Sequence, residues 1–114
     1  MRYCSPWKDA VITITTSTTV SAEVNLEANY EFLTVICPAL TSATVNIHIS
    51  DNPSGTFAPL HALDDDATGS FLHASTAGVG AMAFVFRIGG VQHIKVVAGA
   101  AQAANRTFKV RGFN

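Results

Sequence analysis

A period of two in the apolar residues is the feature that most constrains the fold of this chain. Between Ile12 and Leu26, six apolar residues share one parity, while Thr, Ser, Asn and Glu take the other. The same alternation returns in ATVNIHIS (43–50) and in RTFKVRGF (106–113). Successive side chains of a strand point to opposite faces, so this period predicts half-buried antiparallel strands. The first segment forms one long strand, or two strands that bend near TSTT (16–19).

The segment EFLTVICPA (31–39) is different, because it is apolar on both parities. This pattern predicts a central strand that is covered on both faces and ends at Pro38. In TFAPLHAL (56–63), Pro59 cannot donate a ladder hydrogen bond, which predicts an edge strand.

Two glycines separate the apolar segments AMAFVFRI (81–88) and VQHIKVVA (91–98). A Gly-Gly pair between two strand patterns predicts a two-residue β-hairpin at positions 89–90. The alanine-rich GAAQAAN (99–105) is too short to form a stable helix and is predicted to be a loop.

Together these patterns predict an all-β fold of about eight short strands. The expected architecture is an antiparallel β-sandwich of the jelly-roll type, or a small barrel. Residues 1–10 form an extended N-terminal arm, and residues 11–114 form a single β-sandwich domain.

The charges are few and unevenly distributed. Charged residues make up 13% of the chain, a composition suited to contact with other proteins. Residues 1–66 hold two cations and eight acids, a net charge of −6, whereas residues 67–114 hold five cations and no acid. The two halves either interleave and cancel, or they separate into an acidic and a basic pole suited to contacts between copies.

The stretch HALDDDATGSFLH (61–73) places three carboxylates between two histidines. It lacks the alternating oxygen ligands and the closing Glu of an EF-hand loop. A zinc site with His61, Asp65 and His73 as ligands would match no standard spacing. Asp side chains accept hydrogen bonds from nearby backbone amides, and Gly69 tolerates a positive φ, so the stretch predicts a solvated turn with no metal.

Motifs for catalysis and for cofactor binding are not apparent. The sequence contains no G-x-S-x-G, no convincing Cys and His pair, and no phosphate-binding glycine loop before a helix. Cys4 and Cys37 cannot form a disulfide framework, and Cys37 lies in an apolar run where a thiol acts as a small hydrophobe. We therefore expect no enzyme, no catalytic residue and no cofactor.

Nucleic acid and membranes are not expected as partners. Lys95, Lys109 and Arg111 could form a stripe on one sheet face, with Arg87 and His93 nearby, but the net charge of −1 disfavours nucleic-acid binding. No apolar run approaches the ~20 residues of a membrane helix. The N-terminal MRYCSPWKDAVITITT has no apolar signal-peptide region, so we expect synthesis and retention in the cytoplasm unless the protein leaves within an assembly.

The N-terminal arm contains the sole Trp of the chain, together with Tyr, Arg and Pro. Large aromatic side chains contribute most to stability or binding when they are buried. The arm therefore either packs back over its own domain or anchors in a neighbouring subunit, since Trp, Tyr and Arg are enriched at interface hot spots. The candidate interface residues are Arg2, Tyr3, Trp7, Lys95, Lys109 and Arg111.

Three segments, GTFAPL (55–60), IGGVQHIKV (88–96) and RTFKVRG (106–112), resemble those of small β-sandwich proteins encoded among the virion genes of tailed bacteriophages. The resemblance implies a capsid decoration (cement) protein, or a related head or tail component, located in the virion. It implies a homo-oligomer whose partners are the major capsid protein or other virion proteins. No functional residue carries over. The alternative is a carbohydrate- or receptor-binding β-sandwich module of a phage fibre or tail.

Overall fold

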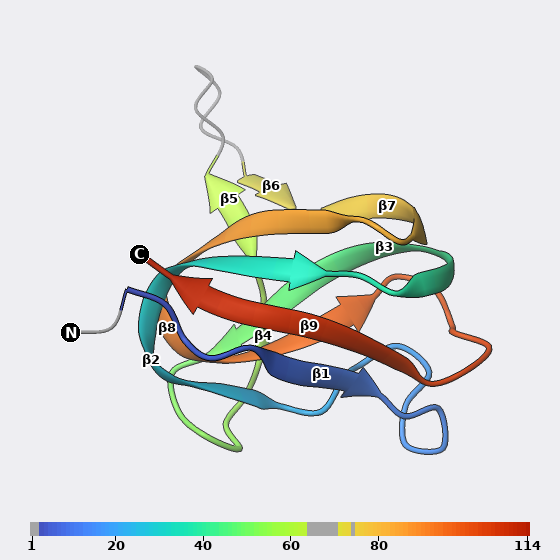
Figure 1. Ribbon diagram of the computed structural model, residues 1–114, viewed down its shortest axis with the longest axis horizontal. Helices are drawn as coiled ribbons and strands as arrows, with labels where there is room; N and C mark the ends of the chain where they lie inside the picture. Colours follow the sequence, from blue (N-terminus) through green and yellow to red (C-terminus); the bar gives the residue numbers. More distant parts are fainter. Residues whose placement is uncertain (1–2, 64–70, 74) are drawn as a thin grey trace.

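The computed structural model of the chain describes residues 3–63, 71–73 and 75–114. For residues 62–63, 71–73 and 75–77 it describes the backbone only. All regular elements in these ranges are β-strands (Figure 1). The strands are β1 (Lys8–Ile12), β2 (Val24–Ile36), β3 (Ala39–Ser50), β4 (Ala58–Pro59), β5 (His61–Leu63), β6 (Phe71–His73), β7 (Ser75–Gly80), β8 (Ala83–Ala98) and β9 (Arg106–Phe113).

Seven of these strands form one antiparallel sheet with the order β1-β9-β2-β8-β3-β4, in which β7 also pairs with β3. Strands β5 and β6 form a separate two-stranded hairpin. The predicted all-β antiparallel fold is confirmed, and Pro59 lies in the edge strand β4 as expected. The more specific architecture, a β-sandwich of the jelly-roll type or a small barrel, stays a prediction. The expectation of short strands is wrong for the centre of the sheet, since β2, β3 and β8 have 13, 12 and 16 residues.

The predicted hairpin at Gly89 and Gly90 is also wrong. Both glycines have positive φ angles, of 79° and 84°, but they lie inside the continuous strand β8. The chain does not reverse there, because the segments before and after the glycines both pair with β2. The register between β2 and β8 shifts on either side of Tyr30, so a β-bulge replaces the expected turn. Glycine is suited to this site because it adopts positive φ without steric cost.

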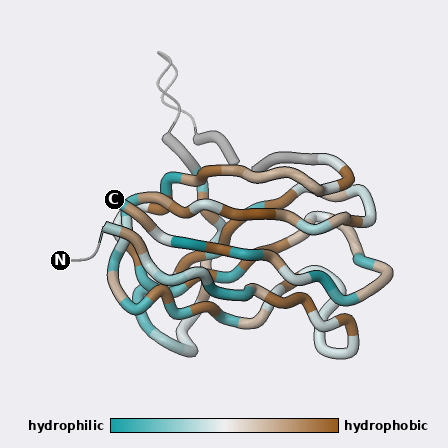
Figure 2. The backbone as a smooth tube through the Cα atoms, in the orientation of Figure 1, coloured by the Kyte–Doolittle hydropathy of each residue, from teal (hydrophilic) through white to brown (hydrophobic). Residues whose placement is uncertain are grey.

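The core is formed by alternate residues of the long strands, as the period of two predicts (Figure 2). Tyr30 is 1% exposed and packs against Gly112, where an added Cβ would lie 2.5 Å from the tyrosine ring. Ile14 and Ala22 were expected inward, but Ile14 is only half-buried and Ala22 is exposed. Ser21 is buried in place of Ala22, and all three residues lie between β1 and β2. The buried side chains with the largest volumes are Tyr30, Phe108, Ile12, Leu26, Leu33, Ile47, Ile88, Ile94, Val35, Val45, Val96 and Val110.

The described part of the N-terminal arm packs along β9. The Ser5 amide donates to the Gly112 carbonyl at 2.8 Å, and the Gly112 amide donates to Ser5 Oγ at 3.0 Å. Cys4 forms an isolated bridge with Phe113, and the chain then enters β1 at Lys8. The backbone of the arm therefore packs against the chain's own sheet, which is the first of the two alternatives predicted for the arm. In the described ranges no helix is long and apolar enough to span a membrane.

Candidate interaction face

The register of β9, β2 and β8 places three rows of side chains on the sheet surface that points away from the core. Residues directly opposite one another on neighbouring strands share a face of the sheet. Leu33 and Phe86 form such a pair and are buried, so the residues before and after them in each strand point outward. The rows are Phe113, Phe32 and Arg87; Arg111, Thr34 and Val85; and Lys109, Ile36 and Ala83. We call these nine residues the outer face.

Much of the outer face is apolar and open to solvent. Val85 is 61% exposed and Ile36 is 43% exposed, although both belong to central strands of the sheet. The prediction that EFLTVICPA (31–39) is covered on both faces is therefore wrong. The segment is apolar on both parities, but its own domain covers just the parity of Leu33 and Val35.

Aromatic rings and a guanidinium contribute to this surface on and beside β9. The Trp7 ring lies over Arg111, with 4.7 Å between the guanidinium carbon and the ring centroid, and the Trp7 side chain is 43% exposed. Phe32 and Phe113 stack with their centroids 5.2 Å apart. Arg111 Nε is buried and has no hydrogen-bond acceptor among the described residues. Stacking holds the guanidinium against Trp7 while its terminal nitrogens can still donate hydrogen bonds in the plane of the group.

The outer face carries three cations and no carboxylate, namely Arg87, Lys109 and Arg111. Two of them pair with acids at its margin: Lys109 Nζ lies 2.6 Å from Asp9 Oδ1, and Arg87 Nε lies 2.7 Å from Glu31 Oε1. Solvent-exposed pairs of this kind contribute little to folding. Arg111 forms no such ion pair within the described part of the chain, so it supplies the excess positive charge of this surface.

The structure brings together some of the predicted interface residues and separates others. Trp7, Lys109 and Arg111 gather at the outer face, and Tyr3 is 73% exposed in the arm. Lys95 lies elsewhere, beyond the glycine bulge of β8, with its Nζ 4.6 Å from the centroid of the Phe57 ring. Arg2 lies outside the described residues. The predicted stripe is therefore divided, because Lys109 and Arg111 lie opposite β2, whereas Lys95 lies opposite His48 of β3.

Sequence reasoning missed the apolar members of the outer face. Phe32 and Ile36 were assigned to a strand covered on both faces, and Val85 belongs to the apolar segment AMAFVFRI (81–88), for which no interface was predicted. The available signal was the pair of large apolar residues Phe32 and Ile36 on the outward parity of EFLTVICPA (31–39), which indicates either a second covered face or a surface that needs a partner. A single chain does not distinguish these two cases.

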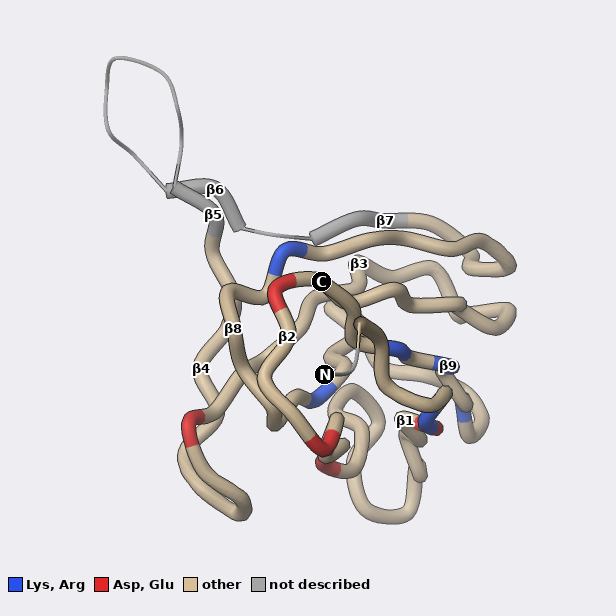
Figure 3. The backbone as a smooth tube through the Cα atoms, turned by 60° about the vertical axis from the view of Figure 1, so that its left-hand side comes forward, with Lys and Arg blue, Asp and Glu red and all other residues tan. Residues whose placement is uncertain are grey.

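The acidic and basic halves of the sequence interleave in space. Arg87 pairs with Glu31, Lys109 with Asp9, and His93 with Glu23, so each of these pairs joins the second half of the chain to the first. Lys8 and Glu27 form a further pair within the first half. Figure 3 shows these oppositely charged segments next to one another along β1, β2, β8 and β9. Among the described residues the charges cancel locally and form no separate poles.

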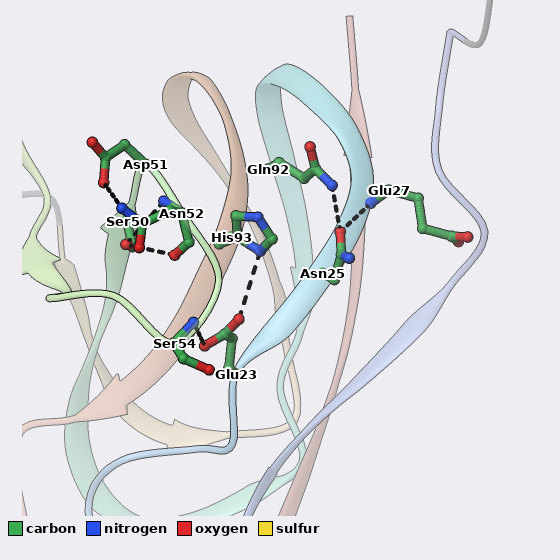
Figure 4. Close-up of polar contacts among 9 residues, drawn as sticks. All are labelled: Glu23, Asn25, Glu27, Ser50, Asp51, Asn52, Ser54, Gln92 and His93. Atoms are coloured by element: carbon green, nitrogen blue, oxygen red, sulfur yellow. Dashed lines mark hydrogen bonds and ion pairs between the residues drawn. The ribbon is translucent and has the colours of Figure 1, made fainter.

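A polar cluster around Glu23 has a structural role (Figure 4). Glu23 Oε1 accepts a hydrogen bond from the Ser54 amide at 2.9 Å, and Glu23 Oε2 lies 3.6 Å from Nδ1 of the buried His93. Nearby, Asn25 Oδ1 accepts hydrogen bonds from Gln92 Nε2 and from the Glu27 amide, both at 2.8 Å. These contacts tie the loop after β3 and the bulge of β2 to β8.

The two histidines of the DDD stretch lie on paired strands. His61 lies opposite His73 in the register of β5 and β6. Residues 64–70, which include all three aspartates and the predicted turn, lie outside the described residues. No cluster of three or more potential metal ligands occurs in the part of the chain that the structure describes.

The two cysteines are unpaired and differ in environment. Cys4 is exposed, whereas Cys37 is 3% exposed at the end of β2. Burial disfavours the thiolate and raises the pKa of the Cys37 thiol to about 11. Cys37 is therefore a buried apolar group, as predicted.

Comparison with known proteins bears on the fold. No family model and no curated protein matches the chain. The crystal structure of the SPBc2 prophage-derived protein YomS superposes with a TM-score of 0.55, at 16% sequence identity, over 96% of each chain. At this identity the likeness to YomS establishes a shared fold.

Proposed function

We propose that this chain is a structural protein of a tailed-phage virion, and that it attaches to a neighbouring virion protein through the outer face and Trp7. One observation carries the proposal: two central strands expose Ile36 and Val85 beside a Trp stacked on an Arg. Contiguous apolar surface of this kind marks interaction sites in folded proteins. In its most specific form the proposal is a capsid decoration protein.

The chemistry of the outer face indicates what its partner presents. Trp and Arg are enriched among the residues that dominate binding energy, and such anchors lie near the centre of an interface. The excess positive charge at Arg111 favours a partner surface with an apolar centre and a carboxylate opposite that guanidinium. The chain needs no catalytic group and no cofactor for this role.

Two further observations support a phage origin. The chain shares its fold, over 96% of both lengths, with a protein described as prophage-derived. The segments GTFAPL (55–60) and RTFKVRG (106–112) resemble those of small virion β-sandwich proteins. The more specific role of a capsid decoration protein rests on what this resemblance implies.

The test is to locate the protein in purified particles. Mass spectrometry should detect the chain at a copy number that fits the symmetry of the capsid or the tail. Electron microscopy should then show its density on the particle, with the outer face turned toward a neighbouring protein. Absence of the chain from purified particles, when it is abundant in infected cells, would contradict the proposal.

A further inference from the structure

A pocket of about 290 Å³ lies between the loop after β1 and the second half of β8. It is separate from the outer face, whose residues do not line it. This volume is near the lower end of the range for small-molecule sites, which is about 300 to 1,000 Å³. The lining residues are Val11, Thr13, Thr16, Ser17, Val20, Ser21, Ala22 and Lys95.

The pocket wall combines fixed backbone with hydroxyl groups. Ser17 Oγ accepts hydrogen bonds from the Thr19 and Val20 amides, at 3.3 and 3.1 Å, which holds the loop in shape. Ser21 Oγ accepts from the Val96 amide at 2.9 Å and joins the loop to β8. These two serines therefore build the wall, and the hydroxyls of Thr13 and Thr16 are the groups that can bind a ligand.

Lys95 is the one charged residue among those that line this pocket. Its ammonium group lies over the Phe57 ring and has no carboxylate within ion-pair distance among the described residues. An ammonium group has three N–H donors, and the aromatic ring leaves some of them unused. The site thus offers a cation and two hydroxyls beside the apolar side chains of Val11 and Val20.

We propose that this pocket binds a carboxylate-bearing sugar unit of the uronic acid type. The carboxylate would pair with Lys95, the sugar hydroxyls would bond to Thr13 and Thr16, and the apolar ring face would lie on Val11 and Val20. A neutral sugar would leave the ammonium unpaired, and a simple carboxylate would leave the hydroxyls and the apolar wall unused. This inference is independent of the virion role and goes beyond it.

NMR tests the proposal, with glucuronate, glucose and acetate titrated separately into the full ¹⁵N-labelled chain. Glucuronate should cause saturable shifts of the amides in residues 11–22 and of Lys95. It should bind at least about tenfold more tightly than glucose, the effect of one charge-assisted hydrogen bond. Acetate should bind more weakly than glucuronate. Absence of saturable shifts, or equal affinity for acetate and glucuronate, would overturn the proposal.

Three variants locate the binding energy. Lys95→Gln should remove the preference for glucuronate over glucose, and Thr16→Val should weaken both sugars. Lys109→Gln, a cation on the outer face, is the matched control and should leave all three affinities unchanged. A dispersed spectrum checks the fold of each variant, and Thr16→Val carries the test if Lys95→Gln loses its fold. Unchanged binding in folded Lys95→Gln, or in folded Thr16→Val, would refute the site.

Discussion

The inner and outer faces of β2, β8 and β9 are built from alternate residues of the same strands, and both are rich in apolar side chains. On the inner face Leu33, Val35 and Phe86 are at most 7% exposed. On the outer face Ile36 is 43% exposed and Val85 is 61% exposed. A strand can therefore be apolar on both parities although the chain buries only one of its faces, and the exposed face is the one that we propose for a partner.

The largest difference between the two faces should appear in folding stability. Leu33→Ala removes a fully buried side chain and should lower the free energy of unfolding by about 2 to 5 kcal/mol. Val85→Ala should change it by about 0.5 kcal/mol or less, because that side chain is mainly in solvent. Urea denaturation measures both values. A similar large cost for the two variants would mean that the outer face is covered within the folded chain.

The next effect concerns binding through the outer face. Trp7→Ala should weaken attachment by about 2 kcal/mol, or roughly 30-fold, if Trp7 is a buried anchor in the complex. Trp7→Phe keeps a ring over Arg111 and should retain part of the affinity. Each variant is added to particles that lack the protein, and the occupancy reached on those particles measures its binding. Full occupancy by Trp7→Ala would show that the stacked pair is dispensable.

The end of β2 allows a chemical comparison of inward and exposed groups. Cys37 continues the inward parity of Leu33 and Val35, so a thiol reagent at pH 8 should modify Cys4 and leave Cys37 unmodified. Mass spectrometry of the folded protein measures the sites. Fast modification of both thiols would contradict the burial of Cys37.

The same thiol gives a pH dependence of stability. Its folded-state pKa is raised from 9.0 to about 11, so the folded state retains a proton that the unfolded state loses. The contribution of Cys37 is therefore fully present below pH 9 and is lost as the pH rises through 11. Urea denaturation between pH 9 and 11 compares the free energy of unfolding of Cys37→Ala with that of the parent protein. The variant should lack the part of the decline in this free energy that is caused by the thiol. An identical decline in both proteins would show that the thiol does not contribute to it.

The smallest effect is expected at the margin of the outer face. Lys109 and Asp9 form an exposed ion pair, and a double-mutant cycle with alanine should give a coupling energy of about 1 kcal/mol or less. This value should fall as salt is added. A larger, salt-independent coupling would indicate that the pair is shielded from water.

The sequence predicted the strand class and the inward parity, but it did not predict where strands continue or which faces stay open. Alternation at Phe108 and Val110 reports burial directly, so these predictions are confirmed. Gly89 and Gly90 suit a hairpin and a bulge equally, and pairing of both halves of β8 with β2 decides between them. Trp7 and Arg111 were both candidates, but their contact depends on the register of β1 with β9, which local patterns do not encode.

The most direct test of the central claim uses two valines with nearly equal exposure. Val85 in the outer face is 61% exposed, and Val79 in β7 is 64% exposed. Val85→Asp places a charge in the proposed interface, and Val79→Asp is the matched control. Both proteins should fold, and binding to particles that lack the protein should fall at least about tenfold for Val85→Asp and stay unchanged for Val79→Asp. Wild-type binding by Val85→Asp, or equal loss in both variants, would contradict the assignment of the outer face as the contact surface.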